Sequence, residues 1–254
     1  MTDPLTTSTP QERALALLWS RGTRGARGPA RGLTLERIVE AAIEVVERDG
    51  PAAMSLRRVA AHLGVGVASL YTYFPGRAEL EALMLDAVAV GRTLPHELPG
   101  DWRAKLTALA HDDWREIRLH PWVLELGVAE QVPGPNMLRW LDSALRIFDG
   151  TGLSEAEKLS AIETVDAYVR GLGRLRGPGG RPGSGSPEPG GTDTDAEDTR
   201  ERDLALGQLV DFDRYPALLR ALAAGAMPYS GAPFEFGLQR LLDGIEQLVI
   251  RRST

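Results

Sequence analysis

The chain has 254 residues, of which 43% are hydrophobic and 25% are charged, so it holds enough apolar material for a sizeable core. It contains no cysteine, which excludes disulfides, thiolate catalysis and cysteine-based metal sites. No stretch approaches the roughly 18 uncharged apolar residues that a membrane span requires, and the start lacks the basic flank of a secretory signal. We therefore expect a soluble, cytoplasmic protein.

Charge is distributed unevenly along the chain. The total is −6, yet residues 12–77 carry ten arginines against six acidic residues, and the remainder is strongly acidic. A basic front followed by an acidic body is typical of a protein whose front alone faces phosphates. The charge pattern divides the chain near residue 78.

Residues 1–32 form an N-terminal extension. The segment "ERALALLW" predicts a short helix, and "SRGTRGARGPARG" (20–32) follows with Arg21, Arg24, Arg27 and no acid. Two interpretations of the second segment stay open. It is either a flexible arm whose arginines enter a minor groove, or a linker without a partner.

Residues 34–49, "TLERIVEAAIEVVERD", place apolar side chains at spacings of three and four, which predicts an amphipathic helix capped by Thr34. Ser55 is expected to cap a second helix that ends at Gly64. Gly66 then begins a third helix that we expect to run to about Phe74. Two short helices joined by a tight glycine turn are typical of a helix-turn-helix.

The rest of the chain keeps a helical pattern without period-two alternation. Long apolar stripes mark residues 154–176, which begin with the capping-box pair Ser154 and Glu157, and residues 234–250. The segment 177–200 is rich in Gly, Pro, Ser and acids and is expected to be a disordered loop, followed by short helices near 202–211 and 215–224. The predicted fold is all-α, with a three-helix head (33–77) and a larger helical body (78–254).

The third helix of the head carries the candidate contacts with DNA. With Leu70 and Phe74 facing inward, the outer surface is left to Val67, Ala68, Ser69, Tyr71 and Tyr73. Gly66 leaves backbone N–H groups bare at the helix start. Small side chains permit approach to base edges, and tyrosine hydroxyls donate to phosphates. Arg57 can contact a guanine edge and Arg77 a phosphate.

The run "LTLERIVEAAIEVVERDGPAAMSLRRVAAHLGVGVASLYTYFPGRAELEALM" (33–84) resembles the DNA-binding region of the TetR/AcrR repressors. The resemblance implies a homodimer, paired through helices near 154–176 and 234–250, that reads palindromic double-stranded operator DNA and is released by a small molecule. It implies base contacts from Arg57, Val67, Ala68 and Ser69, and phosphate contacts from Ser55, Tyr71, Tyr73 and Arg77. The alternative is a helical small-molecule-binding or partner-docking protein without specific DNA binding.

Four of the five tryptophans fall in one stretch of about 40 residues within the body. This cluster is typical either of an apolar ligand pocket or of ordinary aromatic core packing. The candidate ligand contacts are His111, Trp114, Arg118, Trp122, Trp140, Phe148, Asp166 and Tyr168. The four histidines show no metal-ligand spacing, and there is no nucleophile elbow or phosphate-binding loop. We expect no catalytic residue, metal, cofactor or enzyme activity.

Overall fold

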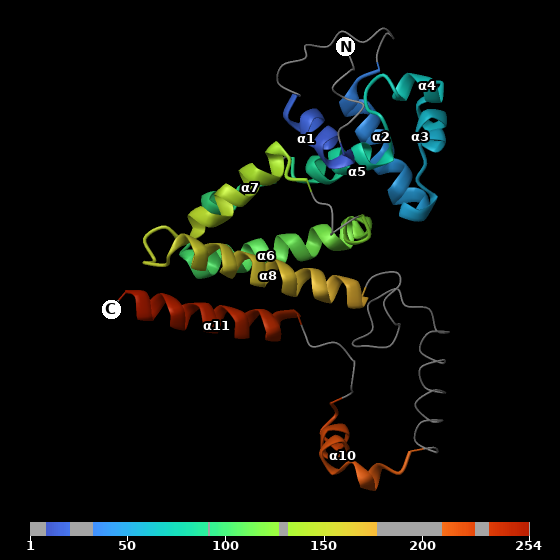
Figure 1. The fold of residues 1–254 in the computed structure, drawn as a ribbon. Coiled ribbons are helices and arrows are strands. Elements are labelled where there is room, and N and C mark those ends of the chain that lie inside the picture. The colour runs from blue at the N-terminus through green and yellow to red at the C-terminus, as the bar shows by residue number, and fades with distance from the viewer. Residues whose placement is uncertain are drawn as a thin grey trace.

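The computed structural model describes residues 9–20, 33–90, 92–126, 132–176, 210–226 and 234–253. Throughout these residues the regular elements are helices, as predicted (Figure 1). The α-helices are α1 (Pro10–Ser20), α2 (Leu35–Asp49), α3 (Leu56–Leu63), α4 (Val67–Leu70), α5 (Arg77–Val88), α6 (Trp102–Leu119), α7 (Pro135–Leu145), α8 (Glu155–Arg176), α10 (Pro216–Ala223) and α11 (Phe234–Arg252). No helix of this described part is long and apolar enough to cross a membrane.

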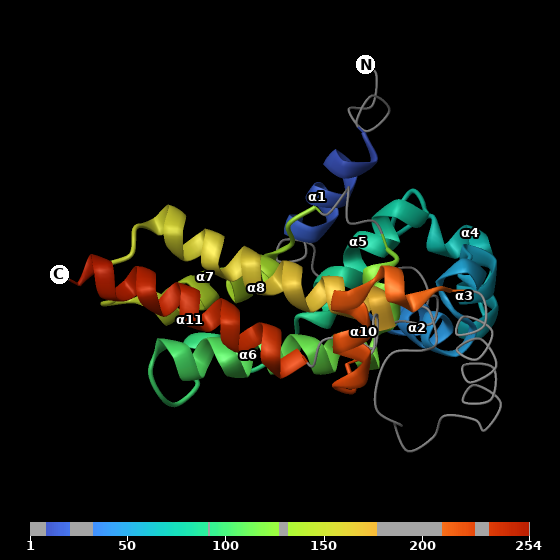
Figure 2. The ribbon, with the colours of Figure 1, turned by 90° about the horizontal axis from the view of Figure 1, so that it is seen from below.

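The buried side chains form two cores. The head core joins α2, α3 and α4 to α1 and α5, with Ile38, Leu70, Leu80 and Leu83 all at 0% exposure. The body core joins α6, α7, α8 and α11. Seen from below, α6, α8 and α11 run alongside one another, and the head helices lie at one end of this layer (Figure 2).

The helix ends predicted from capping residues are confirmed. Thr34 Oγ1 accepts from Arg37 N at 3.2 Å and Ser55 Oγ from Arg58 N at 3.3 Å, so each satisfies an amide that its helix leaves unpaired. Ser154 and Glu157 form the reciprocal capping box, with Ser154 N donating to Glu157 Oε2 at 2.9 Å. Gly64 ends α3 with φ +67°, a conformation that favours glycine.

The third helix of the head is shorter than predicted. α4 contains only Val67–Leu70, and Tyr71–Tyr73 form a turn rather than a continuation to Phe74. The amides of Tyr73 and Phe74 both donate to Leu70 O, at 2.9 and 3.3 Å, which closes the chain on itself. Phe74 also precedes Pro75, and a residue before proline disfavours the helical region.

Several contacts join the head core to the body. Trp122, in the 3-10 turn Pro121–Leu124 after α6, is 2% exposed and packs among the head residues. Asp86, near the end of α5, accepts from the backbone N of Asn136 at 3.1 Å and of Met137 at 3.0 Å and so caps the N-terminus of α7. His120 Nδ1 lies 2.7 Å from Glu47 Oε1 of α2. The head is therefore held by α5, by α7 and by the corner after α6.

Three segments were predicted between residues 176 and 234. The predicted helix near 215–224 is confirmed as α10. The loop 177–200 lies outside the described residues, as does almost all of the predicted helix 202–211.

Candidate functional site

The helix-turn-helix is built on a small set of buried anchors. Val59 and Ala60 fix α3, and Leu70 and Phe74 fix α4 and its turn, with exposures of 0 to 2%. The inward orientation predicted for Leu70 and Phe74 is confirmed. The anchors hold α3 and α4 together across the Gly64–Gly66 turn and leave one side of the pair to solvent.

The outer surface of this motif presents Arg57, Gly66, Ala68 and Tyr71, and the Tyr71 side chain is 55% exposed. Among the described residues the Arg57 guanidinium makes no hydrogen bond or ion pair. Its neighbour Arg58 differs, because Arg58 Nη1 lies 3.2 Å from Asp49 Oδ2. Arg57 is thus an exposed cation available to a ligand, and Arg58 is already paired.

Three other predicted DNA contacts have partners within the protein. The Tyr73 hydroxyl donates to Leu33 O at 2.7 Å and so holds the start of the head in place. The expected orientation of this hydroxyl toward the outer surface is therefore not observed. Arg77 donates to Met54 O at 3.1 Å, to Pro51 O at 3.3 Å and to Glu81 Oε1 at 2.6 Å. Val67 is half-buried against the head core.

The remaining predicted DNA residues are Ser55 and Ser69, both half-buried, and the arginines of the N-terminal arm. Ser55 acts as the N-cap of α3, as described above. Ser69 O accepts a 2.7 Å hydrogen bond from Thr72 Oγ1, which stabilises the turn after α4. Arg21, Arg24 and Arg27 lie outside the described residues.

Most of the predicted ligand residues of the body pack against one another. Phe234 is the centre of one group, with ring centroids 5.1 Å from His111, 5.2 Å from Trp114 and 6.0 Å from Tyr168. Phe148 is fully buried and stacks on Trp102 at 5.8 Å. This arrangement favours the interpretation as aromatic core packing.

The other predicted ligand residues are dispersed. Trp122 belongs to the head core, Arg118 is exposed, and Asp166 pairs with Arg170 one turn along α8 at 2.8 Å. Trp140 on α7 faces the Arg92 guanidinium, 5.5 Å from the ring centroid. The eight residues therefore do not surround a single cavity.

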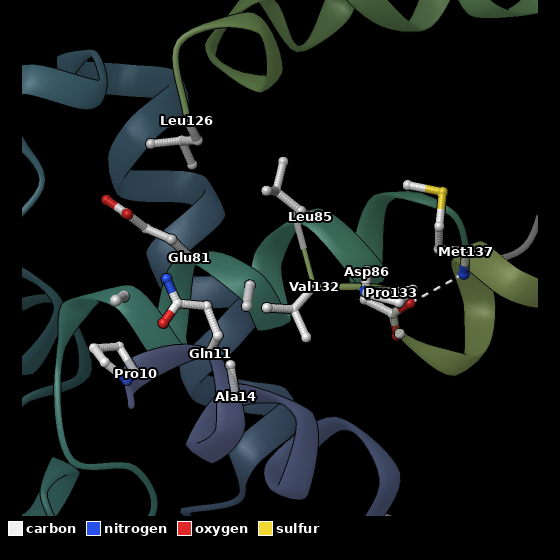
Figure 3. A pocket seen from close by; sticks show the side chains of 13 residues that line it. Pro10, Gln11, Ala14, Glu81, Leu85, Asp86, Leu126, Val132, Pro133 and Met137 are labelled. Atoms are coloured by element: carbon white, nitrogen blue, oxygen red, sulfur yellow. Dashed lines mark hydrogen bonds between the residues drawn. The ribbon is translucent and has the colours of Figure 1, made fainter. Parts of the chain in front are cut away.

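Two hollows are present elsewhere. One of about 270 Å³ lies between α1, α5 and the chain entering α7, where Leu85, Leu126, Val132 and Met137 supply apolar surface (Figure 3). The other, of about 480 Å³, lies between the head and α6, and its lining includes Arg92 and His120. None of the eight predicted ligand residues lines either hollow.

A buried ionic cluster next to the second hollow was missed by the sequence analysis. Arg92 Nη2 lies 2.6 Å from Asp113 Oδ1, and Asp113 is only 8% exposed. Burial raises the pKa of the Asp113 carboxyl to about 6, although Arg92 and Arg170 lower the pKa and Asp166 raises it. Asp113 Oδ2 and Arg170 Nη1 are buried without a hydrogen-bond partner among the described residues.

Known proteins share both halves of this architecture. Residues 38–82 match the family described as bacterial regulatory proteins, tetR family, and residues 94–249 match the tetracyclin repressor-like C-terminal domain. The HTH-type transcriptional repressor DrrR1 of Streptomyces coeruleorubidus is 39% identical over 94% of this chain and 87% of its own length. The chain belongs to the TetR family of transcriptional regulators.

Other TetR family members agree with this assignment. An HTH-type transcriptional regulator of Saccharopolyspora erythraea is 32% identical over 67% of this chain and 72% of its own. The Streptomyces coelicolor protein ActR, in a crystal structure with actinorhodin, has the same fold, with a TM-score of 0.69 and 22% identity over 85% of this chain and 96% of its own. This TetR family chain is a ligand-responsive DNA-binding regulator, not an enzyme.

Sequence signals pointed to some residues of this TetR family regulator and not to others. The arginine excess and the helix-turn-helix spacing located the exposed Arg57. Arg92 and Asp113 are 21 positions apart in the chain, so no local spacing of residues in the sequence predicts that they pair. A single acid on the apolar face of α6, among Leu106, Leu109 and Ala110, was the available signal.

Proposed function

We propose that the protein is a homodimeric repressor, acting in the cytoplasm, which binds a palindromic operator and is released from it by a small molecule. The observation that carries the proposal is the exposed side of the α3–α4 pair, where small side chains and a tyrosine lie beside an arginine that has no ion-pair partner among the described residues. Such a surface combines base contact with phosphate contact. Arg57 contacts a base edge, Ala68 permits close approach and Tyr71 donates to a phosphate.

The faces of α8 and α11 support the dimer. Arg252 of α11 pairs with Glu157 of α8 at 2.6 Å, and side chains of both helices share the body core. Even so, large apolar side chains remain on the outside, with exposures of 67% at Leu175, 59% at Phe236 and 52% at Ile250. A second copy of the chain that packs against α8 and α11 across a two-fold axis buries this surface in a four-helix bundle. The resulting dimer presents two heads to one operator.

Release requires that a ligand favour a head position that fits DNA less well. The contacts between head and body described above provide the mechanical connection. α5 contributes Leu80, Leu83 and Met84 to the head core, while its Asp86 caps α7 of the body. A shift in the body is therefore transmitted to α3 and α4 through α5.

A matched pair of variants tests the DNA surface. Arg57→Gln and Arg58→Gln each remove one positive charge from α3, so each weakens non-specific binding to a similar extent. We expect R57Q alone to lose about 1–3 kcal/mol of operator binding, roughly 5- to 150-fold, because a base contact is lost. The measurement is fluorescence anisotropy with DNA upstream of the protein's own gene and with a scrambled duplex of equal length.

Equal losses of operator affinity in R57Q and R58Q would show that Arg57 does not contact a base. If the wild-type protein shows no salt-sensitive preference for any such fragment, the alternative of a helical binding protein without specific DNA binding is favoured instead.

A further inference from the structure

We infer that Arg92 occupies the place of an organic cation, and that the effector is an aromatic or apolar molecule bearing a positively charged nitrogen that displaces Arg92 from Asp113 and Trp140. The inference rests on the proposed function, in that release from DNA is the consequence of the displacement.

The surroundings of the Arg92 guanidinium are those of a cation-binding site. A carboxylate oxygen of Asp113 lies 2.6 Å from Nη2, and the Trp140 ring lies 5.5 Å from Cζ. A carboxylate together with the face of an indole is the combination by which proteins bind alkylammonium groups. Within the described part of the chain Asp113 Oδ2 is buried without a hydrogen-bond partner, so the carboxylate has a further lone pair for an N–H donor of a ligand.

The charges around Arg92 indicate the sign of the charge that the ligand carries. Arg92 and Arg170 oppose Asp113 and Asp166, so the four groups are neutral together. Moving Arg92 out leaves a net charge of −1 in a largely buried place, and a buried unpaired charge is costly. A cationic ligand restores the balance with Asp113 ionised, whereas a neutral ligand requires Asp113 to take up a proton and an anionic ligand adds to the imbalance.

The second hollow reaches this site at Arg92, while Asp113 and Trp140 lie behind Arg92 and do not line the hollow. Arg92 lines the hollow of about 480 Å³, together with Asp112, Arg115, Glu116 and His120 from α6 and its end, Ile43 from α2 and residues near the end of α5. A ligand in this hollow contacts Arg92 and lies between the head and the body. Its charged nitrogen reaches Asp113 and Trp140 once Arg92 has moved away.

Displacement of Arg92 acts on the helix that holds the head. Arg92 lies four residues beyond Val88, the last residue of α5, and its ion pair ties this end of α5 to α6. Breaking the tie frees α5 to move relative to α6. The state with Arg92 bound to Asp113 is then the state that fits DNA.

The test uses three probes that share one ring system: 1-naphthylmethylammonium, 1-naphthalenemethanol and 1-naphthoate. Binding to the full-length protein is measured by isothermal titration calorimetry, and operator affinity by anisotropy, for the wild type, Arg92→Gln and Asp113→Asn. Circular dichroism establishes that each variant is folded. We expect the ammonium to bind at least tenfold more tightly than the alcohol and the naphthoate.

The two variants should change the affinity for the ammonium in opposite directions. R92Q removes the internal competitor, so it should bind the ammonium several-fold more tightly and the operator more weakly. D113N should lose at least tenfold in ammonium affinity. If D113N does not fold, the R92Q result alone decides.

Equal affinity for ammonium and alcohol, preference for the naphthoate, no saturable binding of the ammonium at millimolar concentration, or unchanged ammonium affinity in R92Q would each overturn the cation site. Unchanged operator affinity in R92Q would overturn its connection to release. Specific operator binding by the wild type is measured without any probe, so failure of the proposed repressor function is distinguishable from failure of the cation site.

Discussion

Tyr71 and Tyr73 are two residues apart and have different surroundings. The Tyr71 side chain is 55% exposed on the surface proposed to face DNA, and the Tyr73 hydroxyl donates to Leu33 O. Residue type and spacing do not distinguish the two tyrosines. Only the turn that ends α4 after Leu70 rotates Tyr73 back toward the head.

We predict that Tyr71→Phe lowers operator affinity by about 3- to 10-fold, since a lost hydrogen bond costs on the order of 1 kcal/mol, and leaves the free energy of unfolding unchanged. Tyr73→Phe is the matched control. It should lower the free energy of unfolding by about 1 kcal/mol, because Leu33 O loses its donor. Anisotropy titration and urea unfolding give the two quantities, and unchanged operator affinity in Y71F would exclude the phosphate contact.

Asp113 makes the stability of the folded protein depend on pH. Its pKa is raised to about 6 from a model-peptide value of 3.8. The contribution of the protonated carboxyl is therefore fully present below the unfolded pKa and is lost as the pH rises through 6. Between pH 4.5 and pH 7.5 we expect the wild type to lose about 2 kcal/mol relative to Asp113→Asn, which does not titrate.

Urea unfolding of the two proteins at both pH values measures this loss. The other titrating groups are shared by both proteins and cancel in the difference. A difference that stays constant with pH, or one that favours the wild type as the pH rises, would show that Asp113 has an ordinary pKa.

At the scale of elements, the corner after α6 connects the two cores. Trp122 is 2% exposed among the head residues, and Leu124 in the same 3-10 turn packs in the body core. The sequence places Trp122 near three other tryptophans, a cluster that is compatible with a shared ligand pocket or with ordinary core packing. Periodicity cannot show how the 3-10 turn that begins at Pro121 redirects the side chains after α6, so the assignment of Trp122 to the head required the structure.

We predict that Trp122→Ala costs about 3–5 kcal/mol of stability, as expected for truncation of a buried tryptophan. The loss should appear as faster amide hydrogen exchange in α2 and α5, because Trp122 belongs to the head core that these helices help to build. Trp114→Ala, which removes a ring that packs on Phe234, is the control and should act on α8 and α11 instead. Faster exchange confined to the body in W122A would contradict the connection.

Much of the fold was accessible from the sequence because its signals are local. Thr34, Ser55, Gly64 and the Ser154–Glu157 pair each mark a helix end through the backbone groups next to them. The contacts that join head to body are of another kind. Asp86 with Asn136, and Arg92 with Asp113, pair residues far apart in the chain, and their partners are chosen by packing.

At the scale of the whole molecule, the head core and the body core are joined through α5, α7 and the corner after α6. This connection lets one protomer transmit a shift from the body to its own helix-turn-helix. Discrimination of a palindrome needs a second head in addition, which the proposed dimer would hold in fixed register through α8 and α11 of both protomers. The proposed repressor function therefore depends on the proposed dimer as much as on the DNA surface.

The stoichiometry of the operator complex tests this account most directly. Size-exclusion chromatography with light scattering measures the complex on a full palindromic operator, and anisotropy compares this operator with a duplex that carries one half-site. We predict two chains per full operator, half-sites centred about 34 Å apart, and affinity for the half-site duplex weaker by at least tenfold. One chain per duplex, with equal affinity for the half-site and the full operator, would contradict the account.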